Sequence, residues 1–282
     1  MSNAPLVLIG SRGMLGRAFF QEFAAIGRAF TPLNREQFDL SKPEEVALAL
    51  PAHTRIVINC AAWTNVDGAE KDEAAATKVN GEGLAALAQS CAEAGALLVN
   101  FGTDYVFSGN AEKPYRTTEK RNPINAYGRS KAAGEAALKQ SGCDYLHIRT
   151  SWLYAPWGTN FVRTISKAAK EKPVLKVVND QRGRPTSAEH LARTTLALLD
   201  EGADGIYHAT DGGECTWFEF AQEIVRLGKL PAKVEPCTSA EFPRPAKRPA
   251  YSVLDLSQTE ELVGPMPSWK SNLKDVIKRL EP

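Results

Sequence analysis

The stretch Leu6-Val-Leu-Ile-Gly-Ser-Arg-Gly-Met-Leu-Gly16 decides the fold. It opens with a short apolar run, Leu6–Ile9, of the kind that forms a strand buried on both faces of a parallel sheet. From residue 14 to residue 27 apolar side chains recur at helical spacing, and Gly27 suits a helix C-cap. The turn between strand and helix contains three glycines: Gly10, Gly13 and Gly16.

Glycines in such a turn let backbone N–H groups approach a pyrophosphate closely. The N-terminus of the following helix adds unpaired N–H groups and a dipole that favours an anion. A purely structural turn is the alternative, but the strand before the glycines and the helix after them favour a nucleotide site. We therefore expect Gly10, Gly13 and Gly16 to bind a dinucleotide cofactor.

The same alternation of strand and helix extends outward to about residue 150. Strands are expected at residues 29–33, 55–59, 97–101 and 145–149, and helices at residues 43–50, 74–94 and 125–140. Alternating elements of this kind predict βαβ units, so the fold class is α/β, with a Rossmann-type doubly wound parallel sheet.

Beyond residue 150 the alternation loosens and prolines accumulate. A strand is expected at Val174–Val178, and Thr186 with Glu189 matches a capping box for a helix that reaches Leu199. We expect a dinucleotide-binding domain over residues 1–150. Residues 151–282 are expected to form a smaller C-terminal substrate-binding lobe, interleaved with the last elements of the Rossmann sheet.

Composition excludes several classes of partner. The chain has 282 residues and a formal net charge of +1, without a basic face, so no nucleic acid is expected. No segment has the length of a membrane span, and no leader segment is apparent at the N-terminus. The cysteines are scattered and odd in number, which argues against disulfides and zinc and favours a cytoplasmic location: Cys60, Cys91, Cys143, Cys215 and Cys237.

The end of the second strand bears on the choice of cofactor. A carboxylate there would favour NAD by binding the ribose hydroxyls. The chain instead has Leu33-Asn34-Arg35, and the Arg35 guanidinium suits a 2′-phosphate. NADPH is therefore the expected cofactor, and acceptance of NADH stays open. An ordinary surface role for Arg35 is the alternative. Asp39 and Leu40, a little further on, are placed on the adenine side.

Tyr127-Gly-Arg-Ser-Lys131 sets a phenol and an ammonium group four residues apart, on one face of a helix. A nearby cation favours the phenolate and lowers the tyrosine pKa, which would make Tyr127 a usable acid in a reduction. Lys131 would also bind the nicotinamide ribose. Thr103, after the strand at residues 97–101, is placed to polarise a substrate carbonyl. Such a pair also arises by chance, but here it follows a plausible dinucleotide fold.

Longer stretches match a known family. They include Thr103-Asp-Tyr-Val-Phe-Ser-Gly109, Asp180-Gln-Arg-Gly-Arg-Pro-Thr186 and Arg248-Pro-Ala-Tyr-Ser-Val-Leu-Asp255. On these stretches the chain resembles the extended short-chain dehydrogenase/reductases, and among them the dTDP-4-dehydrorhamnose reductases. The resemblance implies reduction of dTDP-4-dehydro-β-L-rhamnose to dTDP-β-L-rhamnose, in activated rhamnose synthesis.

The resemblance also implies roles for individual residues. It places Gly13, Met14 and Leu15 at the cofactor pyrophosphate. It places Ala61, Ala62 and Trp63 at the nicotinamide. The residues that it assigns to the sugar nucleotide are Thr103, Asp104, Trp152, Asn160 and Arg182. Tyr127, Lys131 and Thr103 match the catalytic trio.

Three residues depart from the family pattern, in which Gly102 is usually Ser, Trp63 usually Tyr and Tyr251 usually Asn. Gly102 and Trp63 fall near the cofactor or the sugar, so the substrate is less firmly implied than the type of reaction. Some family members dimerise through magnesium, but no ligands for it are apparent, so we predict no metal and either a monomer or a homodimer.

Two other functions stay open. The first is a different nucleotide-sugar reductase or epimerase of the same fold; a dehydratase is less favoured, because Thr103 is followed by Asp104-Tyr105 and not by an Asp-Glu pair. The second is a non-catalytic role similar to that of the regulatory subunit of methionine adenosyltransferase.

Arg248 is either a phosphate ligand or a surface cation, and His208 is expected to be a packed residue.

Overall fold

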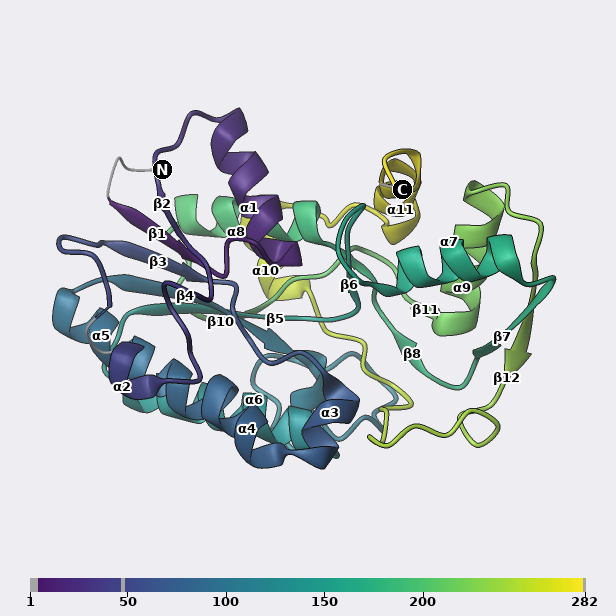
Figure 1. Cartoon of the computed structure of the whole chain (residues 1–282), viewed down its shortest axis with the longest axis horizontal. Coiled ribbons are helices and arrows are strands. Elements are labelled where there is room, and N and C mark those ends of the chain that lie inside the picture. Colours follow the sequence, from purple (N-terminus) through teal and green to yellow (C-terminus); the bar gives the residue numbers. More distant parts are fainter. Residues whose placement is uncertain (1–4, 47–48, 281–282) are drawn as a thin grey trace.

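The structure is a computed structural model that describes residues 5–46 and 49–280. Within them, six parallel strands form the central sheet in the order β10-β5-β4-β3-β1-β2 (Figure 1). Their bounds are β1 Leu6–Ile9, β2 Thr31–Leu33, β3 Ile56–Asn59, β4 Leu97–Thr103, β5 Tyr145–Thr150 and β10 Gly205–His208. Since β1 lies between β2 and β3, the topology switches direction there, which opens a crevice at the carboxyl ends of the strands. The predicted doubly wound parallel sheet is confirmed.

Helices cover both faces of this sheet (Figure 1). One face carries α1 (Met14–Ala25) and α8 (Ala188–Asp200), with α10 (Ser257–Val263) packed against α8. The other face carries α2 (Pro43–Val46), α5 (Leu84–Ala94) and α6 (Ala126–Gln140). The short helices α3 (Val66–Lys71) and α4 (Glu73–Thr77) pack against α6.

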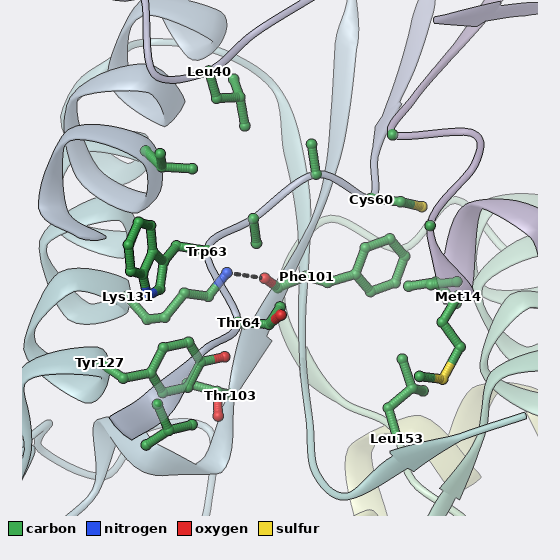
Figure 2. A pocket seen from close by; sticks show the side chains of 18 of the residues that line it. Met14, Leu40, Cys60, Trp63, Thr64, Phe101, Thr103, Tyr127, Lys131 and Leu153 are labelled. Carbon is green, nitrogen blue, oxygen red and sulfur yellow. Dashed lines mark hydrogen bonds between the residues drawn. The ribbon is translucent and has the colours of Figure 1, made fainter. Parts of the chain in front are cut away.

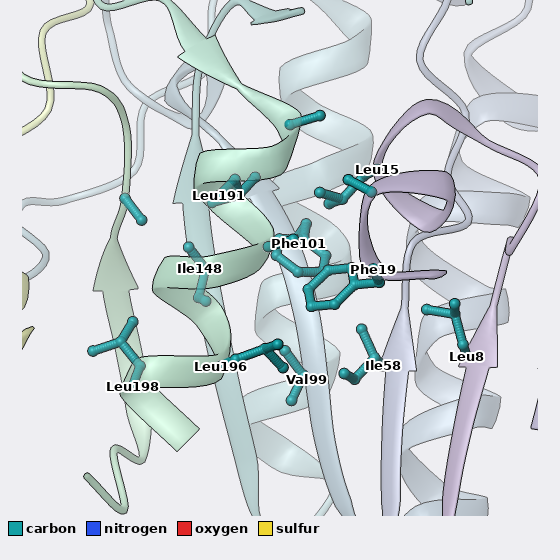
Figure 3. Packing of buried hydrophobic residues seen from close by; sticks show 14 of the residues in the cluster. Leu8, Leu15, Phe19, Ile58, Val99, Phe101, Ile148, Leu191, Leu196 and Leu198 are labelled. Carbon is teal, nitrogen blue, oxygen red and sulfur yellow. The ribbon is translucent and has the colours of Figure 1, made fainter. Parts of the chain in front are cut away.

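The core on the α1 side is aromatic at its centre (Figure 3). The Phe19 ring is fully buried, with its centroid 5.9 Å from that of Phe23 and 5.8 Å from that of Phe101 on β4. Leu191 and Leu196 of α8 close the cluster. This packing fixes α1, and therefore the glycine turn at its N-terminus, against the end of the sheet.

A second region holds the elements that follow β5. Its strands pair two by two: β6 (Leu153–Tyr154) with β9 (Thr186–Ser187), β7 (Val174–Val178) with β12 (Lys233–Cys237), and β8 (Arg182–Gly183) with β11 (Cys215–Thr216). Helices α7 (Phe161–Glu171), α9 (Trp217–Leu227) and α11 (Trp269–Lys278) share its own apolar core. Because α8 and β10 return to the central sheet, the chain after residue 150 contributes to both regions. The domain division near residue 150 stays a prediction.

Some predicted elements differ in detail. The helix expected over residues 74–94 is α4, a π-helix η1 (Lys78–Gly83) and α5 in succession. Helix α1 ends at Ala25 with Ile26 as its C-cap, and Gly27 follows with a φ of +65°, as expected of a glycine that terminates a helix. For the helix expected at residues 43–50, residues 47–48 lie outside the described residues, and α2 is described over Pro43–Val46.

The capping box predicted at Thr186 and Glu189 is wrong. Thr186 belongs to β9, and the hydroxyl of Ser187 accepts the bond from the backbone N–H of His190 that caps α8. A capping box instead begins α9, where Thr216 and Glu219 bond each other's backbone N–H groups. Thr186 and Glu189 have the spacing of a capping box, but Thr186 is part of strand β9 and therefore cannot be the N-cap of α8.

The aromatic core gives a stability prediction. Phe19→Ala should lower the free energy of unfolding by about 3–5 kcal/mol, because it leaves a cavity between α1 and β4. The matched control is Phe20→Ala, whose ring is 46% exposed; it should cost about 1 kcal/mol or less. Urea denaturation followed by circular dichroism measures both, and equal losses would contradict the packing described.

Candidate active site

A cavity of about 1140 Å³ opens at the carboxyl ends of the central strands, between the sheet and the second region (Figure 2). Each of four strands delivers a residue to it at or just after its end: Gly10 after β1, Cys60 after β3, Thr103 on β4 and Thr150 on β5. The cavity therefore lies at the topological switch point, where open α/β sheets bind their ligands.

The glycine turn is packed too closely for side chains. Gly10 has a φ of +72°, and a Cβ there would lie 2.8 Å from the amide nitrogen of Ala61. A Cβ on Gly16 would lie 2.2 Å from the carbonyl oxygen of Gly10, so the helix can pack this closely against the turn only with a glycine at position 16. Gly13, Met14 and Leu15 line the cavity. The first turn of α1 contains no acidic residue. These features fit the pyrophosphate of a dinucleotide.

Two arginines lie where the loops after β1 and β2 line the cavity. The side chains of Arg12 and Arg35 are 76% and 81% exposed, and both line it. Arg35 Nε lies 3.4 Å from Asp39 Oδ2, while Arg12 Nη1 reaches Glu36 at 4.0 Å. Leu40 lines the same part of the cavity. Arg12 was not singled out from the sequence, because a lone arginine inside a glycine turn carries no distinguishing pattern.

The loop after β3 is tied to helix α6. Ala61, Ala62 and Trp63 line the cavity. Asn80, on the π-helix, accepts a hydrogen bond from the Trp63 N–H at 2.9 Å and donates to the Trp63 carbonyl at 3.1 Å. It also donates to the Ser130 hydroxyl of α6 at 3.0 Å. The local π-turn thus turns Asn80 toward the loop, in keeping with the frequent use of π-bulges at functional sites.

Thr103, Tyr127 and Lys131 meet in this cavity (Figure 2). Asn125 caps α6 through the N–H of Gly128, so the helix begins just before Tyr127. Tyr127 and Thr103 lie side by side, and the Lys131 ammonium donates to the Phe101 carbonyl at 2.6 Å. The structure therefore brings together the trio that the sequence predicted; the catalytic role of each residue stays a prediction.

The predicted lowering of the Tyr127 pKa is wrong for this structure. Burial raises the pKa of Tyr127 to about 12, although hydrogen bonding with Thr103 offsets part of the effect and the nearby Asp104 adds to it. Burial also lowers the pKa of Lys131 to about 8, against the opposing charge of Glu135. The Lys131 ammonium is held by the Phe101 carbonyl, and the phenol stays protonated at neutral pH.

Asp104 is a buried carboxyl beside this trio, only 2% exposed. Its Oδ1 accepts the Thr103 hydroxyl at 3.1 Å, whereas its Oδ2 has no hydrogen-bond partner among the described residues. Burial raises the pKa of Asp104 to about 7. The nearby Ser252 and Thr103 hydroxyls offset part of that increase in pKa.

Trp152 and Trp217 form a stacked pair on the side of the second region. Their ring centroids are 3.6 Å apart and their planes differ by 11°. Trp152 adopts a positive φ of 46°, which is rare for a bulky residue and is typical of functional sites. Both rings line the cavity. Trp217 was expected only to anchor the lobe; it does pack there, and it also faces the cavity.

For two residues assigned to the substrate, the binding role stays a prediction. The described residues that line the cavity do not include Asn160 or Arg182. Asn160 caps α7 and donates to the carbonyl oxygens of Ala155 and Trp157. The Arg182 guanidinium pairs with Glu214 at 3.4 Å. Both side chains are engaged in structural contacts, which the sequence pattern did not distinguish from ligand contacts.

Of the two alternatives for Arg248, the surface cation is wrong, and the phosphate ligand stays a prediction. Its side chain is 16% exposed and pairs with Asp67 of α3 at 3.0 Å, so it is not a surface cation. Its guanidinium carbon lies 5.8 Å from the ring centroid of Tyr105, which itself lines the cavity. His208 is buried as expected, with Nδ1 3.1 Å from the Asp255 carbonyl oxygen.

Comparison with known proteins identifies the family. The family model described as RmlD substrate binding domain matches residues 4–281. The chain belongs to this family. It is 38% identical to a dTDP-4-dehydrorhamnose reductase of Burkholderia thailandensis, over 94% of this chain and 95% of that protein. The predicted family resemblance is confirmed.

Two further relatives bear on the chemistry of the RmlD family. A probable dTDP-4,6-dihydroxy-2-methyloxan-3-one 4-ketoreductase of Streptomyces antibioticus is 40% identical, over 96% of this chain and 94% of that protein. The crystal structure of a dTDP-4-dehydrorhamnose reductase of Bacillus anthracis in complex with NADP has a TM-score of 0.93 and 34% identity, covering 98% of this chain and 99% of that one.

In the described part of this RmlD-family chain, no three His, Cys, Asp or Glu side chains are grouped to hold a metal ion. Among the same residues, no helix combines the length and apolarity that crossing a bilayer requires.

The buried Asp104 gives a pH-dependent prediction. Because its pKa is raised above 3.8 to about 7, the folded state binds its proton more tightly than the unfolded state does. Stability from this group is full at low pH and falls as the pH rises toward 7, by at most about 1.4 kcal/mol per pH unit.

Urea unfolding of the wild type and of Asp104→Asn at pH 5, 6, 7 and 8 tests this. The wild type should lose stability relative to the variant as the pH rises to 7, and the difference should then level off. Subtracting the two proteins cancels the remaining carboxyl groups. A difference that stays constant over the whole range would show that Asp104 is ionised throughout.

Proposed function

We propose that this protein reduces dTDP-4-dehydro-β-L-rhamnose to dTDP-β-L-rhamnose, with NADPH as the cofactor. The observation that carries the proposal is the meeting of Thr103, Tyr127 and Lys131 inside one cavity, beside a turn that fits a pyrophosphate. The full-length similarity to dTDP-4-dehydrorhamnose reductases supports the choice of substrate.

The chain's own residues would bind the carbonyl and supply the proton. The hydroxyl groups of Thr103 and Tyr127 lie side by side. Both can donate to one substrate oxygen and polarise its carbonyl once the Thr103 hydroxyl turns from Asp104 Oδ1 to the substrate. Tyr127 is protonated at neutral pH, since burial raises its pKa to about 12, and it therefore carries the proton that the new alcohol requires. NADPH, when bound, supplies the hydride. The Lys131 ammonium, which lies in the same cavity, would bind the nicotinamide ribose of the cofactor.

The two ends of the cavity suit the two ligands. The glycine turn would hold the cofactor pyrophosphate, and Arg12 with Arg35 would bind the 2′-phosphate that distinguishes NADPH from NADH. Asp104 and the stacked Trp152 and Trp217 lie on the other side, where the sugar nucleotide would bind. The NADP complex of the Bacillus anthracis relative supports the same cofactor. The free thiols favour the reducing cytoplasm as its location.

A second candidate is reduction of another dTDP-linked 4-keto sugar. The Streptomyces antibioticus relative, named a 4-ketoreductase for a different dTDP sugar, is as similar to this chain as the rhamnose enzyme is. Thr103, Tyr127 and Lys131 act only at the carbonyl and do not discriminate between these sugars. The ratio of kcat/KM for the two substrates decides between them.

Tyr127→Phe tests the proposed reaction. With NADPH and dTDP-4-dehydrorhamnose, the wild type should consume NADPH, and the variant should turn over at least about a hundredfold more slowly, because it keeps the ring but loses the proton donor. Loss of absorbance at the reduced-cofactor band measures the rate.

The control for this variant is NADPH binding, measured by quenching of protein fluorescence. It should stay close to that of the wild type, since the cofactor turn and Lys131 are unchanged. A variant with wild-type turnover would remove Tyr127 from the chemistry. A wild type that binds NADPH but reduces no dTDP-linked keto sugar would refute the proposed function.

The arginine pair gives a separate prediction about the cofactor. Arg35→Ala should raise the KM for NADPH by about tenfold and leave the KM for NADH nearly unchanged, because only NADPH carries the 2′-phosphate. Arg12→Ala should act in the same direction. Steady-state kinetics with both cofactors measure the effect, and equal changes for NADPH and NADH would assign the two arginines to another role.

A further inference from the structure

A chain of hydrogen bonds runs beneath the cavity from the loop after β3 to helix α6. The Ala61 N–H donates to Asn59 Oδ1 at 3.1 Å, and Asn59 Nδ2 donates to Asn100 Oδ1 at 2.8 Å. Asn100 Nδ2 lies 3.1 Å from His147 Nδ1, and His147 Nε2 lies 3.1 Å from Glu135 Oε1. The chain crosses β3, β4 and β5, and its four side chains are each at most 3% exposed.

All the hydrogen bonds of this chain run in one direction, from Ala61 toward Glu135, and this fixes the protonation state of His147. A backbone N–H can only donate, so Asn59 presents its oxygen to Ala61 and its NH₂ to Asn100. Asn100 in turn presents its NH₂ to His147, whose Nδ1 must accept. The proton of His147 is then on Nε2, where it donates to Glu135. A neutral imidazole is required, and burial lowers the pKa of His147 in agreement with that requirement.

One end of this hydrogen-bonded chain lines the candidate active site, and the other lies on the helix that carries Tyr127 and Lys131. Ala61 lines the cavity on the side of the loop. Glu135 follows Tyr127 and Lys131 at intervals of four residues along α6, on the same helix face. Arg149 of β5 holds Glu135 with two hydrogen bonds, of 2.9 and 2.8 Å, so the carboxylate cannot shift to follow another partner. The His147 bond therefore joins a fixed helix to the loop.

Gly102 provides the room for this histidine. A Cβ at position 102 would lie 2.5 Å from His147 Nε2 and 3.2 Å from Glu135 Oε1. It would fall on the hydrogen bond between the two side chains. Gly102 lies on β4 between Phe101, whose carbonyl accepts from Lys131, and Thr103. A substitution there would disturb the chain without adding any group to the cavity side.

We propose that His147 is a positioning residue for the reduction: through Asn100 and Asn59 it sets the distance between the loop at Ala61 and the face of α6 that carries Tyr127 and Lys131. Gly102 is required to make room for it. The inference rests on the proposed function for its kinetic consequence. Cofactor would bind between that loop and that helix face, so a shift of either surface changes the geometry of hydride and proton transfer.

A set of variants tests the proposal. His147→Asn keeps an acceptor for Asn100 but is too short to reach Glu135, so the chain breaks at one known bond. We expect kcat to fall about tenfold, and the KM for the sugar nucleotide to stay within about threefold, because small misplacements act on the reacting geometry. Gly102→Ala should lower kcat at least as much, since its methyl group displaces the imidazole.

The double variant Gly102→Ala, His147→Asn separates the collision between the new methyl group and the His147 imidazole from other effects of the Gly102 substitution. It should lose less activity than the two single variants do together, because the nearest obstacle to the new methyl group, His147 Nε2 at 2.5 Å, is gone, although Arg149 Cγ at 3.0 Å remains. Additive losses in the double variant would overturn the role given to Gly102. If the variants lose thermal stability but keep wild-type kcat, His147 is merely structural and the proposal fails.

NADPH affinity, measured by fluorescence quenching, keeps this test independent of the substrate. Since Ala61 lines the cofactor side, the His147→Asn variant should bind NADPH at least about threefold more weakly than the wild type. An unchanged NADPH Kd together with an unchanged kcat would refute the inference. A wild type that binds NADPH and reduces no dTDP-linked keto sugar would instead refute the proposed function, and the binding comparison would still decide the role of His147.

Discussion

The ammonium group of Lys131 has to remain charged although the side chain is only 6% exposed, and much of the surrounding structure satisfies that constraint. Burial lowers its pKa to about 8. The Phe101 carbonyl, 2.6 Å away, and the charge of Glu135 work against this effect. A buried carboxylate is itself costly unless it is paired, and Arg149 pairs with it through two bonds. The strands β4 and β5 and helix α6 are therefore joined by charge as well as by packing.

The same elements show why the cofactor loop and the catalytic helix need to be tied together. Asn80 joins the Trp63 backbone to Ser130 on one side of the site, and the chain through His147 joins Ala61 to Glu135 on the other. Each tie is made by side-chain amides or an imidazole whose donors and acceptors are both used. Directional bonds of this kind fix one arrangement where apolar contacts would allow small shifts. The loop and the helix thus form one rigid frame around the reacting groups.

The sequence predicted the frame of the fold better than its local detail. Parallel strands are buried on both faces, so runs such as Leu6–Ile9 identify them directly. The π-helix at Lys78–Gly83 has the same alanine-rich surroundings as an ordinary helix, so its i→i+5 hydrogen bonding could not be predicted from the sequence. Tyr127 and Lys131 were predictable as a pair because their spacing follows from helix geometry, and Thr103 was predictable because it follows a buried apolar run. Trp217 was taken for core because an aromatic ring on an amphipathic helix has the same pattern whether its edge faces the core or a cavity.

Local pattern also cannot reveal contacts between residues that are distant in sequence. Arg182, for example, forms an ion pair with Glu214, 32 residues further along the polypeptide. Gly102 departs from the family pattern, and at the level of sequence that departure weakened the assignment of a substrate. In the fold it has a different cause, because a side chain at position 102 would occupy the space of the bond between His147 and Glu135. The departure therefore concerns the support beneath the site, and Thr103, Tyr127 and Lys131 keep their places above it.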